Sequence, residues 1–180
     1  MPVVRARQFV QLIRPVAAAM SKGPLMGAGL LAVLYVWMES PGTYVDSRIT
    51  YLRLAAVGIC LGAAYVFDDP TEDTIGYVPA PLLFRRVVRM AIAVPVAGAW
   101  WLVALTVAGD VPRKLGGPTP AGDLTLEASV MLVAALTAAS IGTRRVTDRL
   151  GGVVAAPILI GLVIAAFFIP AEYAIVVDSP

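Results

Sequence analysis

Five apolar stretches limit what this chain can fold into. They run over residues 24–38, 51–67, 87–107, 124–141 and 153–169, and polar or Gly/Pro-rich segments separate them. A helix that crosses a bilayer needs about 20 apolar residues, so only the first stretch is clearly short for a full crossing. Inside lipid, every backbone polar group must be paired within the protein, which helices achieve. The sequence therefore predicts an all-α, polytopic transmembrane helical bundle of about five spans, with residues 1–180 as one transmembrane domain.

The balance of apolar and charged residues supports the same conclusion. The chain is 59% hydrophobic, its mean hydropathy is +0.83, and only 14% of its residues are charged, against about a quarter in a soluble domain. One soluble core of this size could not bury so much apolar surface, so lipid must solvate much of it.

The first residues predict a different kind of helix. Residues 3–22 place apolar side chains on one helical face and polar side chains on the other. The apolar face is Phe9, Ile13, Val16 and Met20, and the polar face is Arg7, Gln11 and Arg14. We expect an amphipathic interfacial helix along the inner leaflet; the alternative is a frayed basic tail. The pattern does not indicate a removable signal peptide.

The positions of the basic residues predict the orientation. If the N-terminus is inside, the inner segments hold ten of the chain's fourteen Lys and Arg residues. Those ten are Arg5, Arg7, Arg14, Lys22, Arg85, Arg86, Arg89, Arg144, Arg145 and Arg149, and the outer four are Arg48, Arg53, Arg113 and Lys114. Because cytoplasmic loops of membrane proteins carry the excess of Lys and Arg, we expect an N-in, C-out protein of the cytoplasmic (inner) membrane.

The longest polar interruption, residues 68–86, is the candidate functional segment. It opens with four acids and closes with arginines, and the predicted orientation makes it a cytoplasmic loop. We expect it to be a docking surface for a partner protein. Its candidate docking residues are Asp68, Asp69, Glu72, Asp73, Arg85 and Arg86.

The acidic run 68–73 also allows a metal hypothesis. Clustered carboxylates at the inner end of a helix could hold Mg²⁺ and, through it, a diphosphate. The run resembles the DDxxD motif of prenyl-transferring membrane enzymes, with Glu72 at its last position, although those enzymes have two such motifs. The simpler interpretation is that Asp68 and Asp69 end the second span and that the acids pair with arginines or a partner.

Other catalytic and cofactor patterns are missing from the sequence. There is no histidine, no G-x-S-x-G and no phosphate-binding G-x-x-x-x-G-K-[ST] loop. We therefore predict no catalytic, cofactor-binding or metal-ligating residues and no cofactor. Any ATP would be bound by another chain. The single cysteine, Cys60, lies in an apolar stretch and is expected to be a packing residue.

Two charges fall within or near predicted spans. Arg53 and Glu127 lie at similar predicted depth, so they either pair with each other or extend separately to the outer headgroups. We expect Arg89 to extend to the headgroups at the inner side. Trp100 and Trp101 are expected to anchor the third span at an interface.

A small-residue pair in the second span predicts close helix packing. Gly58 and Gly62 lie one turn apart, and glycines at this spacing let two helix backbones approach, within the bundle or across a dimer.

Four short patterns carry a resemblance to a known family. They are Phe67–Pro70 (FDDP), Val78–Pro81 (VPAP), the arginines at 85, 86 and 89, and Trp100–Trp101. Over residues 60–105 the chain resembles small membrane subunits of ABC transporters in high-GC Gram-positive bacteria. The order of an amphipathic helix, spans and an inner loop is similar to ABC-2-type exporters. That resemblance implies that segment 68–86 docks on a separate ATPase subunit, although the family usually has six spans and ends inside.

The predicted function is therefore a permease-like transmembrane subunit of an ABC-type export complex. Its expected partners are membrane lipid, a cytoplasmic ATPase subunit and other membrane subunits in an oligomer, and no nucleic acid. One alternative is a non-catalytic accessory or assembly subunit of a larger membrane complex. A second is a small membrane enzyme that binds a Mg²⁺-diphosphate substrate at residues 68–73.

Overall fold

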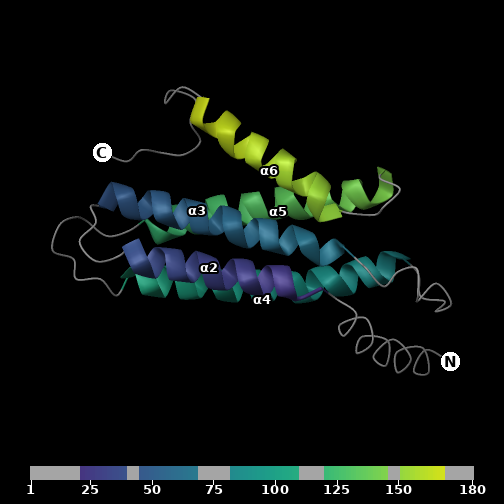
Figure 1. The fold of residues 1–180 in the computed structure, drawn as a ribbon, viewed down its shortest axis with the longest axis horizontal. Coiled ribbons are helices and arrows are strands. Elements are labelled where there is room, and N and C mark those ends of the chain that lie inside the picture. The colour runs from purple at the N-terminus through teal and green to yellow at the C-terminus, as the bar shows by residue number, and fades with distance from the viewer. Residues whose placement is uncertain (1–20, 40–44, 69–81, 110–119, 146–150, 169–180) are drawn as a thin grey trace.

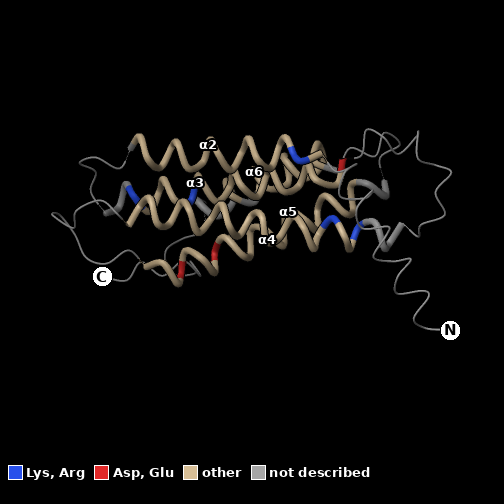
Figure 2. The backbone as a smooth tube through the Cα atoms, turned by 90° about the horizontal axis from the view of Figure 1, so that it is seen from below, with Lys and Arg blue, Asp and Glu red and all other residues tan. Residues whose placement is uncertain are grey.

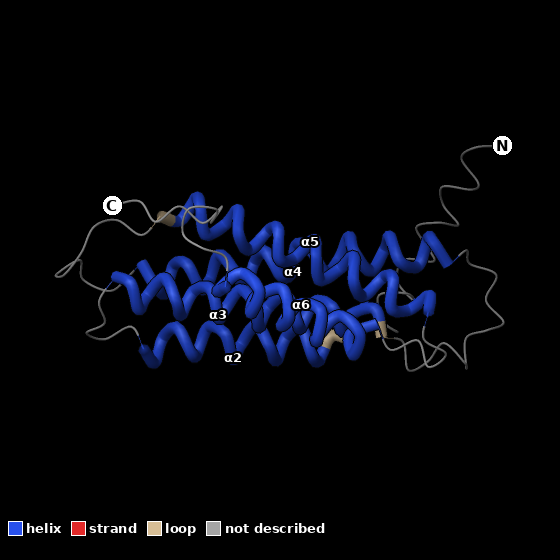
Figure 3. The backbone as a smooth tube through the Cα atoms, turned by 90° about the horizontal axis from the view of Figure 1, so that it is seen from above, coloured by secondary structure: helices blue, strands red, loops and turns tan. Residues whose placement is uncertain are grey.

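Helices make up the regular structure of the chain. A computed structural model describes residues 21–39, 45–68, 82–109, 120–145 and 151–168, and no strand occurs among them (Figure 3). The elements are α2 (Gly23–Glu39), α3 (Val45–Ala64), the 3₁₀ helix η1 (Tyr65–Phe67), α4 (Leu82–Gly109), α5 (Ala121–Arg145) and α6 (Gly151–Phe168). The all-α prediction is confirmed for these residues. The predicted interfacial helix 3–22 lies almost wholly outside them.

Three of the helices are long and apolar enough to cross a membrane. The qualifying segments are Arg48–Phe67, Arg86–Gly109 and Ala121–Gly142. The apolar parts of α2 and α6, Gly23–Met38 and Gly152–Gly161, are shorter. Helix α4 continues through Pro95. Three such helices in one chain are typical of a membrane protein.

The outer surface of the bundle is apolar along the helices. Leu31 lies on α2, Leu102 on α4, and Leu126 and Val133 on α5, and each residue is more than 60% exposed. A water-soluble bundle would place polar residues at such positions, whereas a bundle in lipid has no need to. The exposed apolar residues therefore indicate that the bundle lies in a membrane.

Charged residues gather at the two ends of the bundle. Figure 2 shows a tan middle section, with the described acidic and basic residues toward both ends. We call the end where η1 stops and α4 and α6 begin the Asp68 end. The opposite end, where α5 begins and α2 and α4 stop, is the Glu127 end. Helices α2 to α5 run side by side between the two ends, whereas α6 diverges from α3 and α5 along its length (Figure 1).

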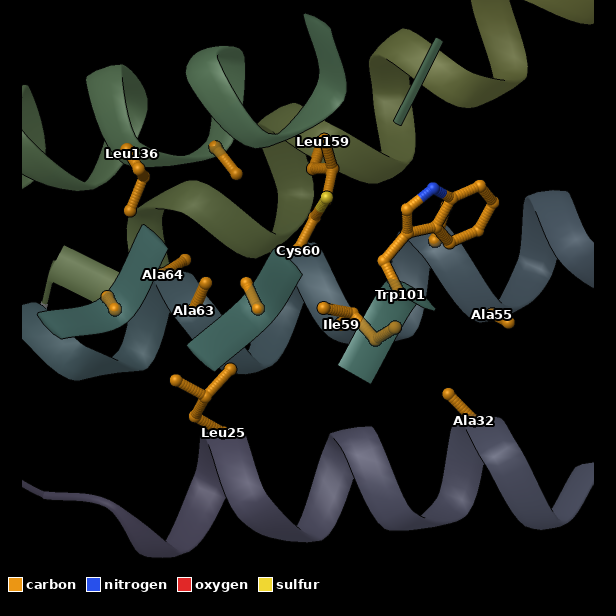
Figure 4. Close-up of a cluster of buried hydrophobic side chains, with 14 of the residues drawn as sticks. Leu25, Ala32, Ala55, Ile59, Cys60, Ala63, Ala64, Trp101, Leu136 and Leu159 are labelled. Carbon is orange, nitrogen blue, oxygen red and sulfur yellow. The ribbon is translucent and has the colours of Figure 1, made fainter. Parts of the chain in front are cut away.

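Small residues bring the helices into close contact. Alanines fill much of the core, for example Ala63, Ala93 and Ala104, which have no exposed surface. Leu25 and Ala32 of α2 face α3 in the core, and Cys60 of α3 and Trp101 of α4 belong to the same buried cluster (Figure 4). Tight packing of small residues is how helices associate in lipid, where burial of apolar surface drives no association.

Candidate functional site

Asp68, the first of the four predicted docking acids, ends η1. Its backbone is extended, with φ −73° and ψ 119°, and its N–H donates to the carbonyl of Tyr65. One oxygen of its side chain, Oδ1, accepts a hydrogen bond of 2.8 Å from the backbone N–H of Gly152. Gly152 is in the first turn of α6, so Asp68 caps a helix that lies 84 residues further along the chain.

The carboxylate of Asp68 acts as a cap that the two residues at the start of α6 cannot provide. The first N–H groups of a helix have no partner within the helix, and a side-chain oxygen just before the helix normally accepts from one of them. Leu150 and Gly151 have no such oxygen. The carboxylate of Asp68 satisfies one of these N–H groups, and its negative charge is also favourable at a helix N-terminus.

Gly152 allows the close approach that the cap requires. It is buried, and a Cβ placed on it would lie 2.5 Å from Cδ1 of Tyr65 and 2.9 Å from Oδ2 of Asp68. The backbone of α6 therefore rests directly on the ring of Tyr65, and any side chain at position 152 would push α6 away from η1.

Arg89 of α4 binds the same corner from the other side. Its Nη1 donates a 3.2 Å hydrogen bond to the carbonyl oxygen of Phe67, and its side chain is only 7% exposed. The prediction that Arg89 extends to the headgroups is wrong for this reason. The carbonyls that end α3 and η1 lack partners within the helix, and a buried cation next to them is favourable.

Together these residues form one cluster, which we call the Asp68 node: Tyr65, Phe67, Asp68, Arg89 and Gly152. Element η1 contacts all five longer helices. Two successive residues, Phe67 and Asp68, bond to α4 and α6 respectively. The start of segment 68–86 is thus fixed to several helices at once.

The other predicted docking residues are only partly covered by the structure. Asp69, Glu72 and Asp73 lie outside the described residues. Arg85 lies in the first turn of α4, but its side chain is not among those described. Arg86 is half-buried. The structure therefore locates Asp68 and Arg86 at the same end of the bundle.

A second polar contact joins α3 and α5 toward the Glu127 end. Nε of Arg53 lies 3.0 Å from Oε2 of Glu127, and the side chains are 36% and 21% exposed. Of the two interpretations left open by the sequence, the structure shows the pair. Each charge thereby has a partner in a region where an unpaired charge would be costly.

Trp101 does not have the anchoring role that the sequence predicts for it. Trp101 is 6% exposed, and its Nε1 donates a 3.1 Å hydrogen bond to Oγ1 of Thr125. It is a core residue between helices, so the prediction that it anchors the span at an interface is wrong. Trp100 packs over Gly29 of α2, where a Cβ would collide with its ring. In the sequence, the hydrogen bond of Trp101 is indicated only by the presence of Thr125 one turn into the following helix.

The two glycines of the predicted packing pair differ in their surroundings. A Cβ on Gly62 would lie 2.6 Å from Cβ of Ala28 and 3.0 Å from the carbonyl oxygen of Pro24, so Gly62 lets α3 approach α2 closely. A Cβ on Gly58 would meet nothing within 4 Å. Gly58 instead lines an open apolar groove of about 410 Å³ between α2 and α3.

Among the described residues, no group of His, Cys, Asp or Glu side chains could hold a metal ion. Cys60 is buried, with its thiol 3.8 Å from the carbonyl oxygen of Ala128, which fits the packing role expected for it.

Comparison with known protein families, with curated proteins and with solved structures found no match to this chain.

Proposed function

We propose that this chain is the transmembrane subunit of an ABC-type export complex and that segment 68–86 couples it to a separate ATPase. In this proposal the Asp68 end faces the cytoplasm, α2 to α6 cross the inner membrane as five spans, and the N-terminus is inside. The bias of Lys and Arg toward the Asp68 end supports that orientation.

The attachment of the segment to the bundle is the observation that carries the proposal. A docking loop can do mechanical work on a membrane domain only if its ends are fixed to the helices that must move. Segment 68–86 meets this condition at Asp68, which is bonded to α6, and close to its other end at Arg89, which is bonded to Phe67. Force applied between these points would reach α3, α4 and α6 together.

The Asp68 contact weighs against the diphosphate-enzyme alternative. Oδ1 of Asp68 accepts from Gly152, and Oδ2 lies close against the α6 backbone. A carboxylate that supports a helix in this way is poorly placed to bind a hydrated Mg²⁺ ion, which demands near-ideal octahedral geometry. The docking function does not need Asp68 to be free, because the proposed docking residues also include Asp69, Glu72 and Asp73.

Affinity purification in mild detergent, with identification of the co-purifying proteins, tests the proposal. An ATPase that has a phosphate-binding loop should co-purify with the chain. Charge reversal at Asp69, Glu72 and Asp73, with Asp68 kept, should release it while the helical content stays unchanged. Charge reversal at Asp123, an exposed acid at the Glu127 end, is the matched control and should leave the ATPase bound.

Two results would overturn the proposal. One is a partner set that contains no ATPase, which would favour the accessory-subunit alternative. The other is an ATPase that stays bound and active after the triple charge reversal.

A further inference from the structure

Helix α6 packs mainly against α5, and also against α3 and η1. Among the α6 residues whose side chains the structure describes, Gly152, Ala155 and Leu159 are buried, and the three residues share one helical face. Val154, next to this face, packs against Gly142 of α5. From Ile160 onward, none of the α6 side chains that the structure describes is buried. Figure 1 shows the same arrangement, because α6 diverges from α3 and α5 toward its C-terminal end.

The second half of α6 carries no polar side chain, and the residues described there are not buried. Ile158, Ile160 and Ile164 are each about half exposed, and every α6 residue is apolar or glycine. Such a surface meets lipid equally well in several orientations, since no polar side chain opposes rotation. A side-chain hydrogen bond to α6 is found at its first turn, from Gly152 to Asp68.

At that start, Asp68 provides the polar contact. Its carboxylate accepts from the Gly152 N–H at 2.8 Å, while Tyr65 supports the backbone at the same residue. In a low-dielectric environment the loss of this hydrogen bond leaves an N–H without a partner, which is costly. The bond thus favours one seating of α6 on η1 over others.

From these observations we infer that Asp68 is a latch: its bond to Gly152 holds α6 in the seated position, and its release lets α6 swing away from α3 and α5. Because Asp69 follows Asp68 directly in the chain, a pull on segment 69–81 acts first on this latch. Asp68 is a positioning residue in this account. The inference concerns the chain alone and holds whether or not an ATPase is the partner.

Distances between two spin labels, measured in the full chain by double electron–electron resonance, test the latch. The chain would carry Cys60→Ala, Leu126→Cys and Ile164→Cys, with spin labels on α5 and α6, and would be reconstituted in lipid nanodiscs. Leu126 and Ile164 are exposed, so the labels should not disturb packing. Asp68→Ala should lengthen the mean distance and broaden its distribution. Asp68→Asn, which keeps an accepting oxygen at the same position, should restore most of the wild-type distribution.

Glycine variants provide a matched pair that leaves Asp68 unchanged. Gly152→Ala, which collides with Tyr65 and Asp68, should reproduce the change caused by Asp68→Ala. Gly161→Ala lies further along the same helix, where a Cβ meets nothing within 4 Å, and should leave the distance unchanged.

Hydrogen exchange at residues 151–154 gives an independent readout. Loss of a hydrogen bond to a charged acceptor should speed exchange of the Gly152 amide by about tenfold or more in Asp68→Ala, with a smaller change in Asp68→Asn. The latch is overturned if the distance distributions of wild type, Asp68→Ala and Gly152→Ala superimpose, or if Asp68→Asn deviates as much as Asp68→Ala. A folded Asp68→Ala variant with wild-type exchange at Gly152 would also overturn it.

Discussion

Nε of Arg53 on α3 lies 3.0 Å from Oε2 of Glu127 on α5, so a single ion pair joins two of the three helices that are long enough to span a membrane. Both side chains keep some exposure. An ion pair of this kind contributes modestly, but the loss of one partner leaves the other charge in a poorly solvated region.

Single neutral substitutions of this pair should therefore cost more than the double substitution. We expect Arg53→Gln or Glu127→Gln to lower the free energy of unfolding by about 1 kcal/mol, and the double variant to recover part of that loss. Exchange of the two charges, Arg53→Glu with Glu127→Arg, should also recover it. Thermal unfolding in detergent measures these differences. If the double variant instead loses as much free energy of unfolding as the two single variants added together, the contact between Arg53 and Glu127 contributes nothing.

The two glycines of α3 should respond in opposite ways to alanine. Gly62→Ala should destabilise the bundle by about 1–3 kcal/mol, since the new Cβ overlaps Ala28 and the backbone of α2. Gly58→Ala should be neutral or stabilising, because its Cβ meets open space and alanine favours the helix. Thermal unfolding of the two variants in the same detergent gives the comparison, and a larger loss for Gly58→Ala would contradict the packing seen between α2 and α3.

The buried Trp101 should be distinguishable from the other tryptophans by its environment. Trp101→Phe removes the hydrogen bond to Thr125 and should cost about 1 kcal/mol, and Trp101→Ala should cost about 3–5 kcal/mol through the cavity it leaves. In variants that each keep one tryptophan, fluorescence of Trp37, which is 63% exposed, should be quenched by lipid-attached or aqueous quenchers far more than that of Trp101. Equal quenching would place Trp101 at the surface.

Two arginines of α4 should differ in the same test of stability. Arg89 is buried and bonded to Phe67, so Arg89→Ala should cost about 2 kcal/mol or more and loosen the contact between η1 and α4. Arg86 is half-buried nearby, and Arg86→Ala should cost less than about 1 kcal/mol. The comparison is made by thermal unfolding in one detergent. A greater loss for Arg86→Ala would show that the Asp68 node does not depend on Arg89.

The sequence predicts the positions of the helices well, because a helix that crosses lipid needs a long uninterrupted run of apolar residues. The stretch 87–107, for example, lies wholly within α4. It could not settle how charges behave at the helix ends. The position of Arg89 next to a polar segment predicts a headgroup-binding residue, and its bond to the carbonyl of Phe67, 22 residues earlier, is not visible in the local sequence.

The sequence predicts one residue of the candidate site, Asp68, but not its partner. Asp68 stands out in the sequence because acids cluster there, and that cluster indicates a surface function. Its bond to Gly152 depends on the packing of α6 against η1, which no local pattern reports. The sequence did contain one signal: α6 begins at Gly151, and neither Leu150 nor Gly151 has a side-chain oxygen that could cap it.

Labelling of single cysteines from each side of the membrane tests the central claim most directly, namely that the Asp68 end of the bundle faces the cytoplasm. In a Cys60→Ala background, Thr74→Cys reports on segment 69–81 and Gly117→Cys reports on segment 110–119. We predict that a membrane-impermeant maleimide labels Gly117→Cys in intact cells, and Thr74→Cys only after the membrane is permeabilised. Labelling of Thr74→Cys in intact cells, with Gly117→Cys protected, would contradict the orientation and with it the docking of a cytoplasmic ATPase.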